Sequence, residues 1–188
     1  LKSKLAGGIE LFSVSQLTFI KGRGGLDTLV STRLVTYYDS IVKDIGRTML
    51  GYDLIKILNK ATEDEPEPEY FELLREAFAS LDDPAINNDL IRLWFMVQLL
   101  RLGGHSANLQ TDVAGAKLTA GAVYHFDYEA VAFTPAAQGQ FTADHIKFLR
   151  LAFAGHGPKV LSQVQDGQRL VANLLPMVLN MLQTHIRT

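Results

Sequence analysis

The stretch NDLIRLWFMVQLLRLGG, residues 88–104, decides how the rest of the chain folds. Between residues 90 and 102 its only polar side chains are those of Arg92, Gln98 and Arg101. At about 100° per residue these three do not share one face, so a helix here is apolar nearly all round. The stretch is also shorter than the roughly 20 apolar residues that a bilayer crossing needs. It therefore predicts a central helix that is covered by other parts of the protein.

Both ends of this predicted helix carry residues that start and stop helices. Asn87 or Asn88 can cap its first turn, and Asp89 places a negative charge at the positive end of the helix dipole. Gly103 and Gly104 supply a residue for the left-handed conformation that ends many helices. The side chains around which we expect the other helices to pack are Trp94, Phe95 and Leu99.

Composition indicates a folded globular protein. The 188 residues allow one generous domain or two small ones, and 47% apolar with 20% charged residues is ordinary for that class. The absence of cysteine excludes disulfides, thiolate metal sites and thiol catalysis, and it fits the cytoplasm. No signal peptide opens the chain, and the late apolar run is broken by Pro176 and Asn180, so we expect no membrane insertion.

Charge is unevenly distributed behind the net value of −2. Residues 1–37 carry five Lys or Arg and two acids, residues 38–83 carry five and twelve, and the remainder carries eight and six. The excess of positive charge is therefore at the start. Because the pI of about 6.2 is lower than the roughly 9 of many dedicated nucleic-acid binders, any site for a polyanion must be local.

The beginning of the chain has the pattern of two β-strands. Residues 9–20 and 26–36 alternate between apolar and polar side chains, with a slip at residues 11–12 where we expect a bulge or kink. The sequence KGRGG at 21–25 predicts the turn of a hairpin. A two-stranded hairpin is marginal in water, and the chain starts with Leu1 rather than methionine, so we expect further strands upstream.

After the strands the pattern changes to that of helices. Apolar residues recur at three and four positions over about 41–59, with Asp39 or Ser40 as the expected cap. Residues 62–69 form an acidic, proline-containing connection to a helix over 69–81. For this acidic run a solvated helix start is favoured over a docking site for a basic partner. The expected inward-facing residues of the second helix are Phe71, Leu74, Phe78 and Leu81.

Residues 105–140 lose helical periodicity, and their runs at 123–126 and 131–134 predict a small second hairpin. Thr142 is expected to cap the next helix, which ends at the GHGP sequence of 155–158. The last helix is expected over about 165–184, with a kink near its proline.

Residues for catalysis or metal binding do not group in the sequence. The five histidines never share the i, i+2 or i, i+4 spacing of metal ligands, and the pairs His125 with Asp127 and His145 with Asp144 are isolated. No G-x-S-x-G elbow occurs, and the carboxylates of 63–69 look solvated. We therefore predict a protein that is not an enzyme and holds no metal or other cofactor.

The glycines of the first turn also allow a phosphate-binding loop, because consecutive glycine amides can surround an anion. The turn lacks the G-K-[ST] ending, however, and a strand follows where nucleotide loops need a helix. A plain hairpin turn is the favoured interpretation. We expect Lys2, Lys4 and Arg33 to lie beside this basic turn. Together these cations could neutralise a few phosphates without reading bases.

Three motifs carry a family resemblance: KLAGGIELF at 4–12, KGRGGLDTL at 21–29 and LLRLGG at 99–104. In this order and spacing, and over essentially the whole chain, the sequence resembles the RecO family of bacterial DNA repair and recombination mediators. The resemblance implies an α+β protein in which residues 1–37 are the last strands of an OB-fold barrel. Residues 38–188 would then be a mainly helical domain with a small β-hairpin.

Family members often hold a four-cysteine zinc site after the central helix, and here the sequence departs from that pattern. Residues 112–115 and 131–133 stand where the cysteine pairs would fall, so no thiolate site can form. Two alternatives are open: a loose region, or apolar packing in place of the metal. The side chains for such packing are Val123, Phe126, Val131 and Phe133.

The resemblance also implies function. Family members bind single- and double-stranded DNA, anneal complementary strands and help to load recombinase together with RecR and single-strand-binding protein. The residues that it implies for DNA contact are Lys2, Lys4, Lys21, Arg23 and Arg33. The acidic C-terminal tail of single-strand-binding protein would meet Arg92 and Arg101 beside exposed parts of Trp94 or Leu93. Alternatively, these arginines only pair with Asp89 or with helix carbonyls.

Two other functions compete with the DNA-binding mediator. The acidic segment 38–83 and the low pI favour a protein-interaction scaffold of the same fold with little or no DNA binding. An enzyme that uses the glycine turn for a nucleotide is a weaker third hypothesis. A titration with a single-stranded oligonucleotide separates the mediator from the scaffold, because the mediator should bind it and the scaffold should not.

Overall fold

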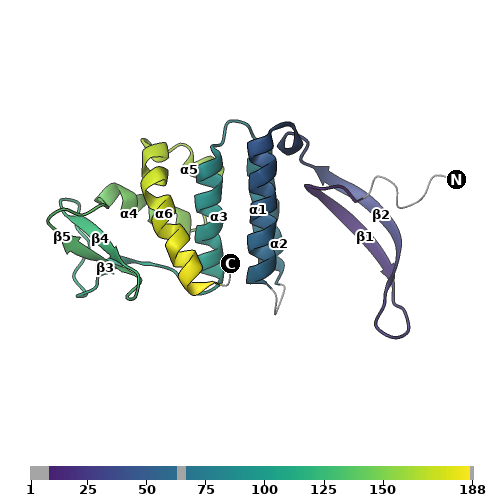
Figure 1. Ribbon diagram of the computed structural model, residues 1–188, viewed down its shortest axis with the longest axis horizontal. Coiled ribbons are helices and arrows are strands. Elements are labelled where there is room, and N and C mark those ends of the chain that lie inside the picture. The colour runs from purple at the N-terminus through teal and green to yellow at the C-terminus, as the bar shows by residue number, and fades with distance from the viewer. Residues whose placement is uncertain (1–8, 63–66, 187–188) are drawn as a thin grey trace.

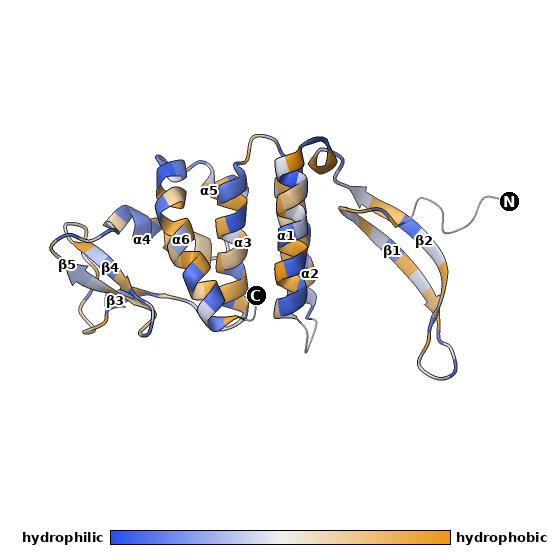
Figure 2. Ribbon diagram, in the orientation of Figure 1, coloured by the Kyte–Doolittle hydropathy of each residue, from blue (hydrophilic) through white to orange (hydrophobic). Residues whose placement is uncertain are grey.

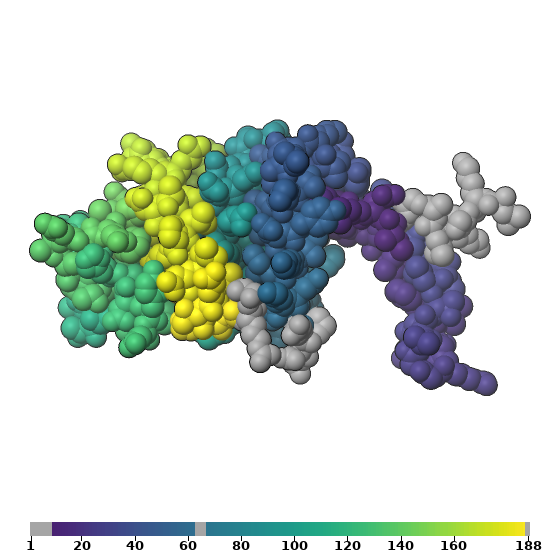
Figure 3. All heavy atoms as spheres, viewed as in Figure 1, coloured from purple at the N-terminus to yellow at the C-terminus, as the bar shows by residue number. Residues whose placement is uncertain are grey.

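The computed structural model describes residues 9–62 and 67–186. An N-terminal hairpin projects from one side of a body of helices, and a second small sheet lies at the opposite side of that body (Figure 1). The α+β class expected from the sequence is confirmed. In the space-filling view the hairpin touches the helices at its base and projects away from them toward its turn (Figure 3).

The hairpin consists of the antiparallel strands β1 (Ser13–Ile20) and β2 (Thr28–Tyr37). Two register shifts interrupt the pairing, one between Val14 and Ser15 and one between Thr18 and Phe19. The slip expected at residues 11–12 is a real change of direction, because Phe12 adopts a left-handed φ of 52° and the strand starts only after it.

Phe12 and Tyr38 fasten the base of the hairpin to the helices. The Tyr38 N–H donates to the carbonyl oxygen of Phe12 over 3.0 Å, which closes the hairpin where both strands end. The Phe12 ring is buried and meets Tyr52 and Phe78 edge-on, with centroid distances of 5.5 and 5.2 Å. A Cβ on Gly51 would lie 2.5 Å from this ring, so the helix has to present a glycine there.

The first long helix, α1 (Ile45–Ala61), follows a short 3-10 turn, η1 (Ile41–Lys43). Its cap is Asp44, whose carboxylate accepts from the Arg47 N–H over 2.8 Å. The expectation of Asp39 or Ser40 as the cap is wrong, because the backbone leaves the helical conformation at Asp44 before α1 begins.

Helix α2 (Pro68–Asp82) begins with proline in its first turn, as its composition predicts. Its buried side follows Leu73, Ala77 and Leu81, which lie one turn apart. Phe71, expected on that side, is 55% exposed. That expectation is wrong because Phe71 is about 200° around the helix from Leu73.

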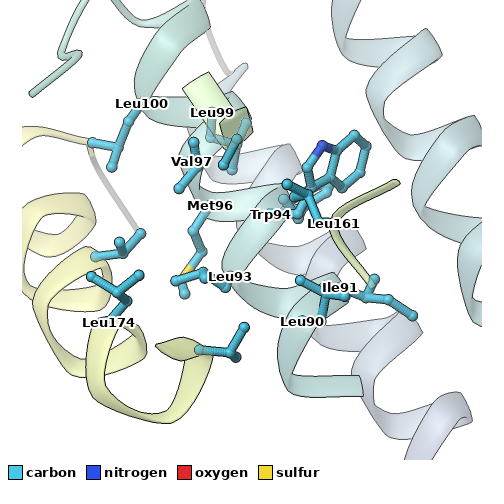
Figure 4. Close-up of a cluster of buried hydrophobic side chains, with 14 of the residues drawn as sticks. Leu90, Ile91, Leu93, Trp94, Met96, Val97, Leu99, Leu100, Leu161 and Leu174 are labelled. Atoms are coloured by element: carbon cyan, nitrogen blue, oxygen red, sulfur yellow. The ribbon is translucent and has the colours of Figure 1, made fainter. Parts of the chain in front are cut away.

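Helix α3 (Asn88–Leu102) is the centre of the body, as predicted. It packs against α1, α2, α4, α5 and α6, and every residue from Leu93 to Leu100 is buried (Figure 4). The side chain of Asn87 caps it by accepting from two backbone N–H groups, and Gly104 takes the left-handed conformation after its end. Each fully buried leucine or isoleucine here stabilises the fold by about 1.5–3 kcal/mol.

Three further helices complete the body: α4 (Ala143–Phe153), the short α5 (Pro158–Leu161) and α6 (Gly167–His185). The apolar residues of α6 lie along one side and pack on α3. Pro176 lies inside α6, which continues on both sides of it. Within the described ranges no helix has the length and apolarity needed to span a bilayer.

The second sheet has three strands: β3 (Asn108–Asp112), β4 (Val123–Asp127) and β5 (Ala132–Ala136), in the order β3-β5-β4. The expected hairpin of 123–126 and 131–134 is confirmed as β4 and β5, which pair antiparallel. Strand β3 was not predicted: its sequence NLQTD is mostly polar, and it pairs in parallel with β5.

Aromatic side chains fill the region where the family resemblance places zinc. Phe133 is fully buried and meets Tyr124, Phe126 and Phe141 edge-on, with centroid distances between 5.1 and 6.1 Å. Each such pair stabilises the fold by about 0.5–1.5 kcal/mol in addition to the stabilisation from burying the aromatic surface. Of the two alternatives for this region, apolar packing is the one observed.

Candidate nucleic-acid interface

The turn between β1 and β2 holds two predicted DNA-contacting residues, Lys21 and Arg23, and both are exposed. Glycine is required in this turn: a Cβ on Gly22 would lie 1.8 Å from the carbonyl oxygen of Leu26. The Gly22 N–H donates to the carboxylate of Asp27 over 3.3 Å, which fixes the two sides of the turn. The sequence KGRGGLD therefore forms a defined turn, which presents two cations at the end of the hairpin farthest from the helices.

The strand register determines which side chains of β1 and β2 lie on the same face of the hairpin. Gln16 pairs with Arg33, and Thr18 pairs with Ser31. Since side chains alternate between faces along a strand, these four lie together on one polar face. Arg33 lies about 15 Å from the turn, at roughly 3.3 Å per residue, so a nucleic-acid backbone following the face could meet all the cations.

The positive charges of the turn and of the polar face are available for a ligand. Within the ranges that the structure describes, Lys21, Arg23 and Arg33 form no ion pair with a carboxylate. The carboxylate of Asp27 offsets part of the positive charge of the turn. Lys2 and Lys4, also predicted to contact DNA, lie outside the described residues.

The other face of the hairpin carries exposed apolar side chains beside Ser15 and Thr32. Leu17, Phe19 and Leu34 lie on it with 43%, 52% and 40% of their surfaces exposed, and Figure 2 shows apolar and polar residues side by side along both strands. This is the face on which further strands of the expected barrel would pack. The barrel itself stays a prediction.

The predicted site for an acidic protein tail is not assembled in one place. A side-chain nitrogen of Arg92 lies 3.2 Å from the carboxylate of Asp53 on α1, whereas Nε of Arg101 donates to the Gln98 side chain over 2.9 Å. The two arginines are nine positions apart, which places them on opposite sides of α3 at about 100° per residue.

The exposure expected of Trp94 and Leu93 is wrong. They are 2% and 0% exposed, because other helices cover α3 on all sides. The alternative interpretation of the arginines also needs correction, because Arg92 pairs with Asp53 of another helix and not with Asp89 of its own.

Around Arg101 lies a cavity of about 300 Å³ between α2 and α3, and Gly155, which follows α4, also lines it. We call it the acidic groove. Its charged lining comprises three carboxylates of α2 and one guanidinium of α3, from Glu69, Glu72, Glu76 and Arg101. Sequence analysis missed it, although the spacing of three and four between those glutamates places them on one side of a helix. An acidic tail would be repelled here.

His145 is a structural residue of the helical body. It is 6% exposed, its Nδ1 accepts from the Thr142 N–H over 3.1 Å, and its Nε2 lies 3.2 Å from the side-chain amide of Asn173. Burial lowers the pKa of its imidazole, and the charge of Arg169 lowers it further, while Asp144 acts in the opposite direction. Within the described residues no group of three or more His, Cys, Asp or Glu could hold a metal ion.

Comparisons with known proteins place the helical body in a family. The family model described as "Recombination protein O C terminal" matches residues 42–186. The DNA repair protein RecO of Desulfatibacillum aliphaticivorans is 29% identical over 113 residues, which cover 58% of this chain and 44% of that protein.

Two further relatives with the same name come from Trichodesmium erythraeum and Listeria welshimeri. They are 33% identical over 105 residues and 30% identical over 128 residues, covering 55% and 68% of this chain. These matches cover 35% and 48% of the relatives' own lengths, so the chain spans less than half of the curated relatives that it matches.

Proposed function

The chain belongs to the recombination protein O family, and on that premise we propose that it acts in DNA repair by contacting DNA backbones through its N-terminal hairpin. The observation that carries this proposal is the projecting hairpin, which exposes Lys21 and Arg23 in its turn and Arg33 on its polar face. Relatives named DNA repair protein RecO support the repair role.

The chemistry of the hairpin suits backbone contact rather than base reading. A lysine and an arginine at the end of a projecting loop can reach phosphates from outside either a single strand or a duplex. Each phosphate that they neutralise releases counterions, so affinity should fall steeply as salt concentration rises. Contact of this kind positions nucleic acid without selecting a sequence.

We propose that the role is that of a mediator: the protein holds strands for annealing and for recombinase loading, with RecR and single-strand-binding protein as partners. The proposal involves no covalent step, so no catalytic residue is assigned. Because the acidic groove surrounds Arg101 with carboxylates, Arg92 is the better of the two arginines for an acidic tail, although it would first have to leave Asp53.

The test is a titration of labelled single-stranded oligonucleotide at several salt concentrations. The variant Lys21→Ala/Arg23→Ala should bind more weakly at every sequence, and its slope of log affinity against log salt should decrease by up to about 1.4, at roughly 0.7 per lost contact. Its melting temperature should stay nearly unchanged, because both side chains are exposed.

The matched control is Lys56→Ala/Lys159→Ala, which removes the same charge from exposed positions on α1 and α5. If both double variants lost affinity equally, only the overall charge would matter and the hairpin would not be the site. Unchanged affinity in the hairpin variant would contradict the proposal as well.

The scaffold function remains the second candidate because residues 38–83 carry twelve acids and five bases. The same titration separates it: no oligonucleotide binding by the unaltered chain at micromolar concentration would favour a scaffold.

A further inference from the structure

The acidic groove contains a buried polar group that has no partner among residues 9–62 and 67–186. Trp94, the only tryptophan of the chain, lines the groove with 98% of its surface buried, and its Nε1 forms no hydrogen bond to any of these residues. In Figure 4 this nitrogen lies on the side of the ring nearer the C-terminal end of α3, where Gln98 and Leu102 line the groove. A buried N–H without an acceptor costs about 1–3 kcal/mol, so it points to an acceptor that a ligand brings.

The walls of the groove favour a cation. The carboxylates of Glu69, Glu72 and Glu76 lie along one side of α2, against the single guanidinium of Arg101. Glu72 also pairs with Arg75, but Glu76 makes no ion pair or hydrogen bond within the described residues. Desolvation raises the pKa of the Glu76 carboxyl, with Arg75 acting in the opposite direction, so a cation placed beside it would relieve an unfavourable environment.

The groove also has the apolar surface that a long basic side chain needs. Pro68, Leu73 and Leu102 line it together with the edge of Trp94. Lysine and arginine lay their methylene groups on apolar surface while the charged end reaches a polar partner. A volume of about 300 Å³ is enough for one such side chain and part of the backbone that carries it.

From these observations we propose that the acidic groove binds a lysine or arginine side chain of a peptide segment from a partner protein. The ammonium or guanidinium group meets Glu76 and Glu69, and a carbonyl oxygen of the same segment accepts from Trp94 Nε1. The partner is thus basic, in contrast to the acidic tail expected near Arg101. The inference does not depend on DNA contact by the hairpin. The hairpin is joined to the helices near the start of α1 and points away from them (Figure 1).

Trp94 makes the test direct, since its fluorescence reports on the groove alone. The probe is a nonapeptide of alternating lysine and alanine, with a glutamate and alanine peptide of equal length as the comparison. We expect the lysine peptide to shift the Trp94 emission in a saturable way and the glutamate peptide to leave it unchanged. Absence of a shift with the lysine peptide, or an equal shift with both peptides, would overturn the proposal.

Variants then separate the groove from general charge attraction. Glu69→Gln/Glu72→Gln/Glu76→Gln should weaken lysine-peptide binding at least tenfold. The control Glu10→Gln/Asp89→Asn/Glu129→Gln removes three exposed acids outside the groove and should change binding less than twofold. Equal losses in both variants would overturn the proposal.

Two measurements keep the result independent of folding and of the proposed function. Thermal melting should show the groove variant folded, and Glu76→Gln alone, with an expected loss of about threefold, replaces it if it is not. Oligonucleotide binding should be the same in the groove variant and the unaltered chain. Failure of the hairpin to bind DNA would leave the peptide result intact, and the reverse also holds.

Discussion

The central helix α3 and the hairpin β1–β2 use apolar residues in opposite ways. From Leu93 to Leu100 every side chain of α3 is buried among five other helices, whereas Leu17, Phe19 and Leu34 of the hairpin are at least 40% exposed. The hairpin is joined to the helical body through Phe12 and Tyr38 at its base, which contact Tyr52 of α1 and Phe78 of α2. The difference indicates that stability resides mainly in the helical body, and that the hairpin contributes little buried apolar surface to it.

The largest effect that tests this comparison is a pair of leucine truncations. Leu99→Ala in α3 should lower the free energy of unfolding by about 2–5 kcal/mol, because it leaves a cavity in a fully packed region. Leu17→Ala in the hairpin should change it by less than about 0.5 kcal/mol. Urea unfolding measures both, and similar losses would break the distinction between the two regions.

A smaller effect is expected at the joint between them. Gly51→Ala puts a Cβ 2.5 Å from the Phe12 ring and should cost about 1–3 kcal/mol of stability. In a Phe12→Ala background the same change should cost nothing, and it could stabilise α1 by about 0.5–1 kcal/mol because alanine favours helix over glycine.

This double-mutant cycle measures how strongly Gly51 and Phe12 are coupled. Denaturant unfolding of the four proteins gives the coupling energy. If Gly51→Ala cost the same with and without the Phe12 ring, the hairpin would not be fastened through that contact.

The smallest effect concerns pH and the helical body alone. Because burial lowers the pKa of folded His145 below its ordinary value of 6.5, the unfolded chain binds a proton more readily. The stability that the neutral imidazole contributes is therefore complete above 6.5 and is lost as pH falls through the lower, folded pKa. His145→Gln should flatten this part of the curve of melting temperature against pH. An unaltered slope would show that another group is responsible.

Helix α3 could be predicted from the sequence because the residues that mark it lie close together in the chain. The apolar run, the Asn87 cap and the Gly104 ending all lie within the helix or next to it, and all were confirmed. The turn at 21–25 was predicted for the same reason. Strand β3 was missed because its pairing with β5 joins residues about twenty positions apart, and nothing in its polar sequence marks it as a strand.

The candidate sites show the same limit. Exposure of Lys21 and Arg23 followed from the turn, but the polar face that adds Arg33 needed the strand register and its two shifts. Arg92, Trp94 and Arg101 all belong to α3, and only the packing of the other helices shows their different surroundings. Arg92 pairs with Asp53, Arg101 lines the acidic groove, and Trp94 is buried with its edge at that groove. The groove itself combines residues of α2, α3 and the end of α4.

Amide hydrogen exchange with and without a single-stranded oligonucleotide shows whether the hairpin, and not the helical body, contacts DNA. Without DNA, the amides of α3 should exchange most slowly and those of β1 and β2 much faster. With DNA, protection should increase in residues 16–33 and stay unchanged in α3. Protection that appears in the helices while the hairpin exchanges as before would contradict the account.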